Sequence, residues 1–154
     1  MMIFIDGADG SGKSTLISEL SEKYAVVRIP RGVNQKLYWN KLRMSACVLT
    51  LVFDRSPLTE IVYRSVDGKH AEFDIEDCLT WIKGEKIIIC DTDTSFSDAH
   101  KRGEDNITDE AKHTLIRDRY HCLADILMMS GYDVYFYDWH NQSVDEILDF
   151  IGGN

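Results

Sequence analysis

The chain has 154 residues, of which 44% are hydrophobic, and its formal net charge is −9. This composition excludes a disordered chain, and the acidic balance argues against a protein that coats nucleic acid, because phosphate contacts need clustered Lys and Arg. No apolar run approaches the ~18 residues of a membrane span, and the apolar start is interrupted at Asp6, so we expect a single cytoplasmic domain with no signal peptide and no membrane association.

Apolar runs alternate with helical patterns along the chain. The runs typical of strands are 2–5, 25–29, 48–53, 86–90 and 132–137. Helical spacing of apolar residues predicts helices at 13–24, 34–46, 57–65, 74–83, 109–129 and 143–151. Short Val/Ile-rich runs separated by helices are typical of a parallel sheet covered on both faces. We therefore predict a three-layer α/β domain around a five-stranded parallel sheet.

The first strand leads directly into a glycine-rich motif. Residues 7–15 read Gly-Ala-Asp-Gly-Ser-Gly-Lys-Ser-Thr, which is the G-x-x-x-x-G-K-[ST] phosphate loop, and a helical pattern follows it. Backbone N–H groups of such a loop cradle nucleotide phosphates, and the helix dipole favours the anion. The predicted nucleotide-binding residues are Gly7, Ala8, Asp9, Gly10, Ser11, Gly12, Lys13, Ser14 and Thr15. Lys13 would reach the phosphates, and the Ser14 hydroxyl would ligate Mg²⁺.

A second polar motif, Asp54-Arg55-Ser56-Pro57, follows the third strand-like run. An arginine at the carboxyl end of a strand points a bidentate donor into the crevice where an acceptor phosphate would lie. The adjacent acid could hold a sugar hydroxyl or a magnesium-bound water. Arg28 and Arg31, near the end of the second run, are further candidates for substrate binding.

The stretch from Asp91 to Asn106 is polar and is predicted to be a long loop. Lys101 and Arg102, followed by a glycine, suit a lid that closes positive charge over a transferring phosphoryl group. Asp91 and Asp93 follow the fourth strand and could either support a magnesium site or cap the next turn.

These pieces together resemble the thymidylate kinase family, within the nucleoside and nucleoside monophosphate kinases. The resemblance rests on residues 4–15, on Asp54-Arg55, on the lid-like residues 101–104 and on the helix around 115–120. It implies a P-loop NTPase fold, and in relatives the acid at the position of Asp9 approaches the acceptor sugar. The family usually carries Arg-Glu-Pro after the second strand, whereas this chain reads Arg-Ile-Pro-Arg at 28–31, without the acid.

The resemblance implies ATP-dependent phosphorylation of a small nucleotide, foremost a deoxynucleoside monophosphate such as dTMP. Lys13, Asp54, Arg55, Lys101 and Arg102 would carry the transfer, with ATP and Mg²⁺ as cofactors. A monophosphate acceptor needs no general base, since its oxygen is already nucleophilic at neutral pH. The resemblance leaves a homodimer open as the oligomeric state.

Three other functions remain open from the sequence. A nucleoside acceptor would need an acid such as Asp6 or Asp54 to take the hydroxyl proton. A modified base in phage DNA, such as hydroxymethyluracil, is a further acceptor, although polymeric DNA fits the acidic chain poorly. A nucleotide-dependent switch without an acceptor is the third, but the nearest stretch to a guanine-reading Asn-Lys-x-Asp motif, residues 40–43, ends in arginine.

The histidines and cysteines favour structural roles. None of the five histidines stands at a spacing typical of a metal site, so we expect no zinc. The four cysteines include no C-x-x-C pair and are predicted to be buried, reduced thiols. The aromatic residues at 132–139 are expected to pack as the last strand of the sheet and its end.

Overall fold

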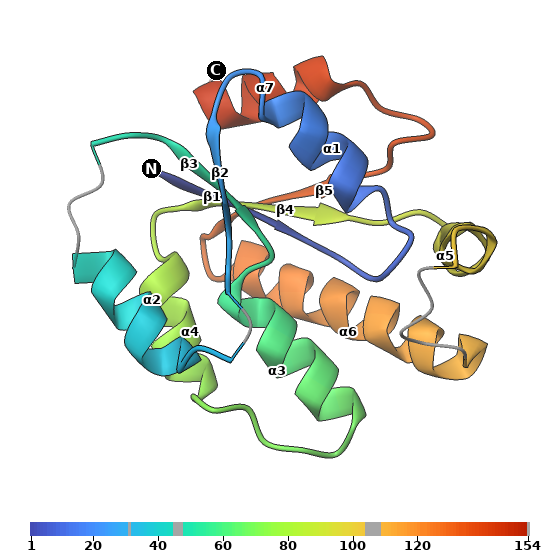
Figure 1. Ribbon diagram of the computed structural model, residues 1–154, viewed down its shortest axis with the longest axis horizontal. Helices are drawn as coiled ribbons and strands as arrows, with labels where there is room; N and C mark the ends of the chain where they lie inside the picture. Colours follow the sequence, from blue (N-terminus) through green and yellow to red (C-terminus); the bar gives the residue numbers. More distant parts are fainter. Residues whose placement is uncertain (31, 45–47, 104–108, 154) are drawn as a thin grey trace.

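The computed structural model describes residues 1–30, 32–44, 48–103 and 109–153 (Figure 1). A five-stranded sheet lies at its centre in the order β2-β3-β1-β4-β5, and every paired neighbour is parallel. The strands are β1 (Met2–Asp6), β2 (Ala25–Arg28), β3 (Leu51–Asp54), β4 (Lys86–Cys90) and β5 (Asp133–Tyr137). The helices are α1 (Lys13–Leu20), α2 (Gln35–Met44), α3 (Pro57–Val66), α4 (Ile75–Ile82), α5 (Ser95–Lys101), α6 (Glu110–Met129) and α7 (Val144–Gly152). The predicted parallel α/β architecture is confirmed.

Helices cover both faces of the sheet (Figure 1). Helices α1 and α7 lie on one face, and α2, α3, α4 and α6 lie on the other. Successive side chains of a strand point to opposite faces, so Ile3 and Ile5 pack beneath α1 and α7 while Phe4 packs against Trp39 and Phe53 on the other side. All five residues of β1 are buried, because this strand is central and covered on both faces.

The order in which the chain adds strands to the sheet reverses between β1 and β4. The chain leaves β1 toward β2 at one edge, whereas it leaves β4 toward β5 at the other edge. The loops that follow these two neighbouring strands therefore diverge and open a crevice at their carboxyl ends, which is where ligands bind in open parallel sheets.

The third strand is shorter at its start than the apolar run 48–53 predicts. It begins at Leu51, and Val48 and Leu49 stand outside the sheet, 96% and 67% exposed. The reason is register, since Leu51 pairs with Met2 of β1 and Ala25 of β2, the first residues of both strands, and among the described residues no strand extends further to pair with residues 48–50. The other predicted elements are confirmed within a few residues, although α1 ends earlier, at Leu20.

The predicted long loop 91–106 contains a helix, so that part of the prediction is wrong. Residues 95–101 form α5, whose small residues Ser95 and Ala99 are buried one turn apart. The apolar pattern of the sequence does not predict this helix, because the buried face of the helix is made of small residues rather than large apolar ones. Residues 104–106 of the predicted segment lie outside the described ranges.

The predicted burial of the cysteines is confirmed for some of them. Cys78 and Cys90 are buried free thiols, but Cys122 is exposed on α6, so the prediction is wrong for that residue. Cys47 lies outside the described ranges. Within the described ranges, no helix is both long enough and apolar enough to cross a bilayer.

Candidate active site

A cavity of about 390 Å³ opens at the carboxyl ends of β1 and β3. Three segments that are far apart in the sequence line it: the phosphate loop, the Asp54-Arg55 pair and the end of α5. The lining residues are Asp9, Gly10, Ser11, Gly12, Lys13, Ser14, Asp54, Arg55, Arg102 and Gly103. The fold thus brings together the three motifs that the sequence singled out. Gly7, Ala8, Thr15, Arg28 and Lys101 are predicted site residues that do not line it.

The phosphate loop is packed so closely that glycine is required in it. A Cβ atom on Gly10 would stand 2.0 Å from the carbonyl oxygen of Ser95 in α5, and one on Gly12 would stand 2.4 Å from Cδ1 of Trp139. Both glycines also have positive φ, at 77° and 93°. Side chains are therefore excluded by contact as well as by backbone conformation. The loop is held between α5 and the segment that follows β5.

Lys13 lies inside the curl of this loop. Its Nζ atom donates hydrogen bonds to the carbonyl oxygens of Gly7 at 2.8 Å and Ala8 at 2.5 Å. Burial lowers the pKa of the Lys13 ammonium from its ordinary value, and the nearby Arg55 guanidinium adds to this effect. An ammonium that is held by backbone carbonyls at the cavity wall is placed to turn to phosphate oxygens.

The carboxylate of Asp6 fastens β1 to the helices below the sheet. It is fully buried and accepts hydrogen bonds from the Ser56 and Thr59 hydroxyls of the α3 N-terminus and from the Tyr120 hydroxyl of α6 at 2.6 Å. The backbone N–H of Gly7 donates to it as well, at 3.1 Å. Because Asp6 is enclosed behind the loop, Asp54 is the acid of the two that the cavity reaches.

Arg55 has an unusual backbone conformation. Among the described residues it alone combines a side chain with a positive φ, of 80°, a conformation that costs roughly 1–2 kcal/mol for a residue with a Cβ. Its N–H donates to the Ile5 carbonyl at 2.9 Å, and its Nη2 lies 3.3 Å from the Asp9 carboxylate. This turn sends the guanidinium back across the cavity toward the phosphate loop instead of out along the strand.

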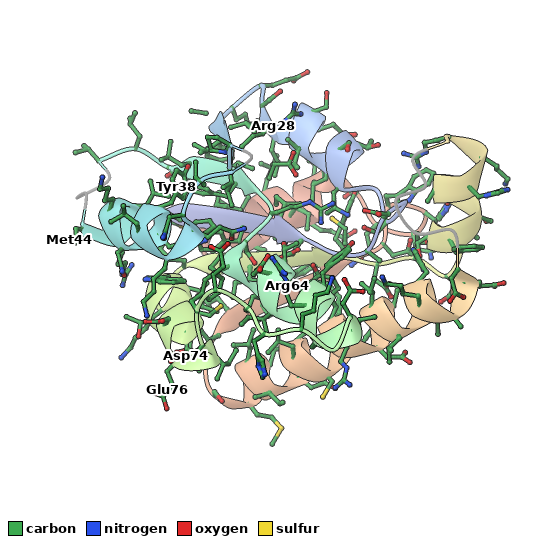
Figure 2. The ribbon with its side chains drawn as sticks, turned by 60° about the horizontal axis from the view of Figure 1, so that its bottom comes forward. Arg28, Tyr38, Met44, Arg64, Asp74 and Glu76 are labelled. Carbon is green, nitrogen blue, oxygen red and sulfur yellow. The ribbon has the colours of Figure 1, made fainter. Side chains whose placement is uncertain are left out.

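Arg28 reaches the same edge of the sheet from β2. Its Nε lies 3.2 Å from Asp54, and its side chain is 75% exposed. Figure 2 labels Arg28 and, on α2, Tyr38 and Met44. In α2, Trp39 is buried while Met44 is 86% exposed. Arg31, the other predicted basic residue of this edge, lies outside the described ranges.

The end of α5 brings Arg102 to the cavity mouth. Arg102 follows the last helical residue and lines the cavity with Gly103, while Lys101 is exposed on the helix and does not line it. That this segment closes over a bound nucleotide remains a prediction.

Asp91 and Asp93 do not line the cavity and are paired with Arg117 instead. Arg117 of α6 donates to both oxygens of Asp91, at 2.6 and 2.9 Å, and lies 3.1 Å from Asp93. Burial raises the pKa of Asp91, but hydrogen bonds from Arg117 and His121 outweigh it and leave this pKa below its ordinary value. These acids therefore join the end of β4 to α6, a role that neither sequence hypothesis included.

The cavity offers oxygen ligands for a hard cation. Ser14, Asp9 and Asp54 all line it, and oxygen ligands are those that Mg²⁺ prefers. Within the described ranges, no group of three or more His, Cys, Asp or Glu side chains could hold a metal ion. The oxygens of Ser14, Asp9 and Asp54 fit Mg²⁺ that arrives with phosphates and keeps several waters.

Comparisons with known proteins identify the fold. No protein-family model and no curated protein matches the sequence. The deoxyadenosine kinase from M. mycoides with bound dCTP is 19% identical, with a TM-score of 0.67 over 100% of both chains. The same kinase with dCMP and dCDP bound is 20% identical, with a TM-score of 0.63 over 99% of this chain and 97% of that one. The YorR protein from Bacillus subtilis, in complex with phosphorylated GDP, is 22% identical, with a TM-score of 0.67 over 99% and 94% of the two chains.

Identities in this range show a shared fold. The chain shares the fold of these structures, a five-stranded parallel sheet with helices on both faces. The closer resemblance to thymidylate kinases stays a prediction.

Within this fold, sequence reasoning missed two residues beside the phosphate loop. The Tyr63 hydroxyl of α3 lies 3.5 Å from the Asp9 carboxylate, and the His113 ring of α6 contacts the Asp9 carbonyl. Burial raises the pKa of Tyr63 to about 12, and the negative charge of Asp9 adds to it, so the phenol is a hydrogen-bond donor at neutral pH. The helical spacing does relate Tyr63 to the site, since it lies one turn after Thr59 on the face of α3 that contacts β1.

Proposed function

We propose that this protein transfers the γ-phosphoryl group of ATP to a nucleotide, most directly to a deoxynucleoside monophosphate such as dTMP. The observation that carries the proposal is the single cavity in which the phosphate loop, Asp54-Arg55 and Arg102 meet. A donor site, an acceptor-side arginine and a cation at the mouth are the parts that direct in-line transfer requires.

The donor half of the reaction uses the loop. Its backbone N–H groups and Lys13 would bind the β- and γ-phosphates, and the Ser14 hydroxyl would hold Mg²⁺. When bound, this ion would neutralise charge on the phosphates. Lys13 would exchange its two carbonyl contacts for phosphate oxygens, so its positive charge follows the charge that develops in the transition state.

The acceptor half uses side chains from β3, α3 and the loop. Arg55 would bind the acceptor phosphate with its guanidinium fork, because Asp9 and the left-handed backbone direct it into the cavity. Asp9 and Tyr63 would face the acceptor sugar. The acceptor phosphate supplies its own nucleophilic oxygen, so this half of the site positions the substrate and moves no proton.

Arg102 would add positive charge at the open side. It lines the cavity from the end of α5, which packs directly on Gly10 of the phosphate loop. A substrate that draws Arg102 and the neighbouring Lys101 inward would exclude water from the transferred group. Charge-assisted hydrogen bonds to a polyphosphate would drive such closure.

A nucleoside acceptor is the second candidate, and Asp54 favours it. This carboxylate lines the cavity and could take a proton from a sugar hydroxyl, whereas Asp6 is enclosed. The neighbours named deoxyadenosine kinase agree with this candidate. Against it, Asp54 is already paired with Arg28, at 3.2 Å.

The test is ADP release from ATP and Mg²⁺ with a panel of acceptors. The panel holds the four deoxynucleosides, the corresponding monophosphates, their ribose forms and an oligonucleotide with hydroxymethyluracil. Lys13→Ala serves as the inactive control. We expect release with one or more deoxynucleoside monophosphates. Release with nucleosides alone would favour the Asp54 alternative, release with the oligonucleotide would favour the DNA base, and acceptor-independent hydrolysis would favour a switch.

A further inference from the structure

His113 is a buried polar residue that contacts the phosphate loop from outside the cavity. It lies in the first turn of α6 and is 2% exposed. Its Nε2 atom stands 2.8 Å from the carbonyl oxygen of Asp9. A carbonyl oxygen can only accept, so Nε2 carries the proton in this hydrogen bond. The ring does not line the cavity, and so it does not touch substrate directly.

This hydrogen bond fixes the orientation of one peptide group of the loop. The peptide between Asp9 and Gly10 is planar and trans, so its N–H points opposite to its C=O. His113 draws the Asp9 carbonyl toward α6, and the N–H of Gly10 therefore points away from α6. Gly10 lines the cavity. The histidine thus sets the direction of an amide whose predicted partner is a phosphate oxygen.

The same contact holds Asp9 from its backbone while Arg55 and Tyr63 hold its side chain. The Asp9 carboxylate lies 3.3 Å from Arg55 and 3.5 Å from the Tyr63 hydroxyl. With the backbone anchored by α6, the carboxylate can meet these partners in one position only. Asp9 is therefore the point where the donor loop and the acceptor side are joined.

Helix α6 anchors the phosphate loop through two residues that lie about two helical turns apart. Tyr120 donates to Asp6, immediately before the loop, and His113 donates to Asp9 within it. The His113 ring also packs edge-on against Phe96 of α5, with centroids 5.4 Å apart and planes at 66°. The one side chain therefore touches the loop and the helix whose end carries Arg102.

We propose that His113 is a positioning residue for phosphoryl transfer, which acts by locking the Asp9–Gly10 peptide so that the Gly10 amide faces the phosphates and the Asp9 carboxylate faces the acceptor. The inference rests on the proposed function for its kinetic consequence. The lock on the loop itself is a property of the unliganded protein.

Three variants separate this role from simple packing. His113→Leu fills the space but removes the donor, and His113→Gln restores an N–H at a similar reach. Ile116→Val, on the buried face of the same helix, removes one methyl group from the packing of α6 without touching the loop. Each variant is compared with the wild type by thermal unfolding, by hydrogen exchange of residues 7–12 and by kinetics with varied ATP and varied acceptor.

We expect His113→Leu to speed exchange in the loop about tenfold and to lower kcat by about the same factor or more, as the loss of one buried hydrogen bond implies. His113→Gln should recover most of both losses. Ile116→Val should change neither, although it lowers the unfolding temperature. The acceptor KM should rise in His113→Leu, because Asp9 loses its fixed position.

Two results would overturn the inference: unchanged loop exchange in His113→Leu, or equal losses in Ile116→Val and His113→Leu. Failure of the proposed function gives a different pattern. In that case the wild type phosphorylates none of the acceptors, while loop exchange and the affinity for ATP still report whether His113 locks the peptide.

Discussion

On the phosphate-loop side of the cavity the backbone builds the site, whereas at the end of β3 side chains build it. Gly10 and Gly12 are each wedged against a neighbour that would stand closer than 3 Å to a Cβ. Across the cavity, the Arg55 guanidinium lies 3.3 Å from the Asp9 carboxylate and 5.6 Å from the centre of the Tyr63 ring, while Arg28 stands outside the lining and is mostly exposed. In the proposed reaction, the rigid backbone would recognise what every nucleotide shares, its phosphates, and the side chains would decide which acceptor is taken.

The largest effect should come from the charge at the centre of the backbone side. Lys13→Ala should lower turnover between about 10² and 10³-fold, because a buried ammonium that stabilises the transferring phosphoryl group is lost. Lys23→Ala, an exposed lysine just beyond α1, is the control and should be neutral. ADP release and thermal unfolding are measured for both. Turnover within threefold of the wild type in a folded Lys13→Ala variant would remove the loop from the chemistry.

Substitutions of two glycines test how tightly the phosphate loop is packed. Gly12→Ala and Gly84→Ala both place a Cβ at positive φ, which costs roughly 1–2 kcal/mol, but a Cβ on Gly84 would meet no other part of the protein within 4 Å. Gly12→Ala should lose a further 1–3 kcal/mol, approximately, through the clash with Trp139. Urea unfolding measures the difference. Equal losses would mean that the loop has room to adapt and that its rigidity is overstated.

The side-chain half should respond selectively to a conservative change. Arg55→Lys replaces a bidentate fork by a point charge, so the acceptor KM should rise about tenfold while the affinity for ATP stays within about twofold. Arg64→Lys, which replaces an arginine paired with Glu60 on the same stretch of chain, is the control. A loss of ATP affinity with normal acceptor binding would put Arg55 on the donor side.

The smallest effect concerns the ion pair that joins β4 to α6. The folded-state pKa of Asp91 is depressed, so its stabilising contribution is complete above the unfolded pKa, near 4, and is lost as the pH falls through the lower folded value. Arg117→Gln should therefore flatten the acid limb of stability below about pH 4. Urea unfolding across that range, with the exposed Arg119→Gln as control, measures it. Parallel acid limbs in the wild type and Arg117→Gln would contradict the assignment.

Sequence patterns predicted the backbone half better than the side-chain half. The phosphate loop is a local motif, and the central strands are continuous apolar runs, so neighbouring residues carry the whole signal. Asp54 and Arg55 were predicted because parallel strands end at a common edge. The direction of the Arg55 side chain into the crevice was predicted too, but its positive φ and the hydrogen bond from its N–H to Ile5 on another strand were not.

Contacts between distant residues account for what was missed. His113 lies 104 residues from Asp9 in the chain, and Tyr63 lies 54 residues from it, so neither shares a motif with its partner. The helix at 95–101 was read as a loop because Ser95 and Ala99, its contact face, carry no apolar periodicity. Small residues pack closely when a glycine backbone faces them, and only the fold shows that Gly10 does so.

The packing of Trp139 against Gly12 gives the protein a built-in optical reporter. The chain has three tryptophans, and the other two, Trp39 and Trp81, lie in the core on the opposite face of the sheet. We expect a ligand that enters the loop to change the surroundings of the Trp139 indole and to leave the other two tryptophans as a constant background. Emission from the native chain should then report occupancy of the loop without any label, and the ligand-dependent change should be absent in Trp139→Phe.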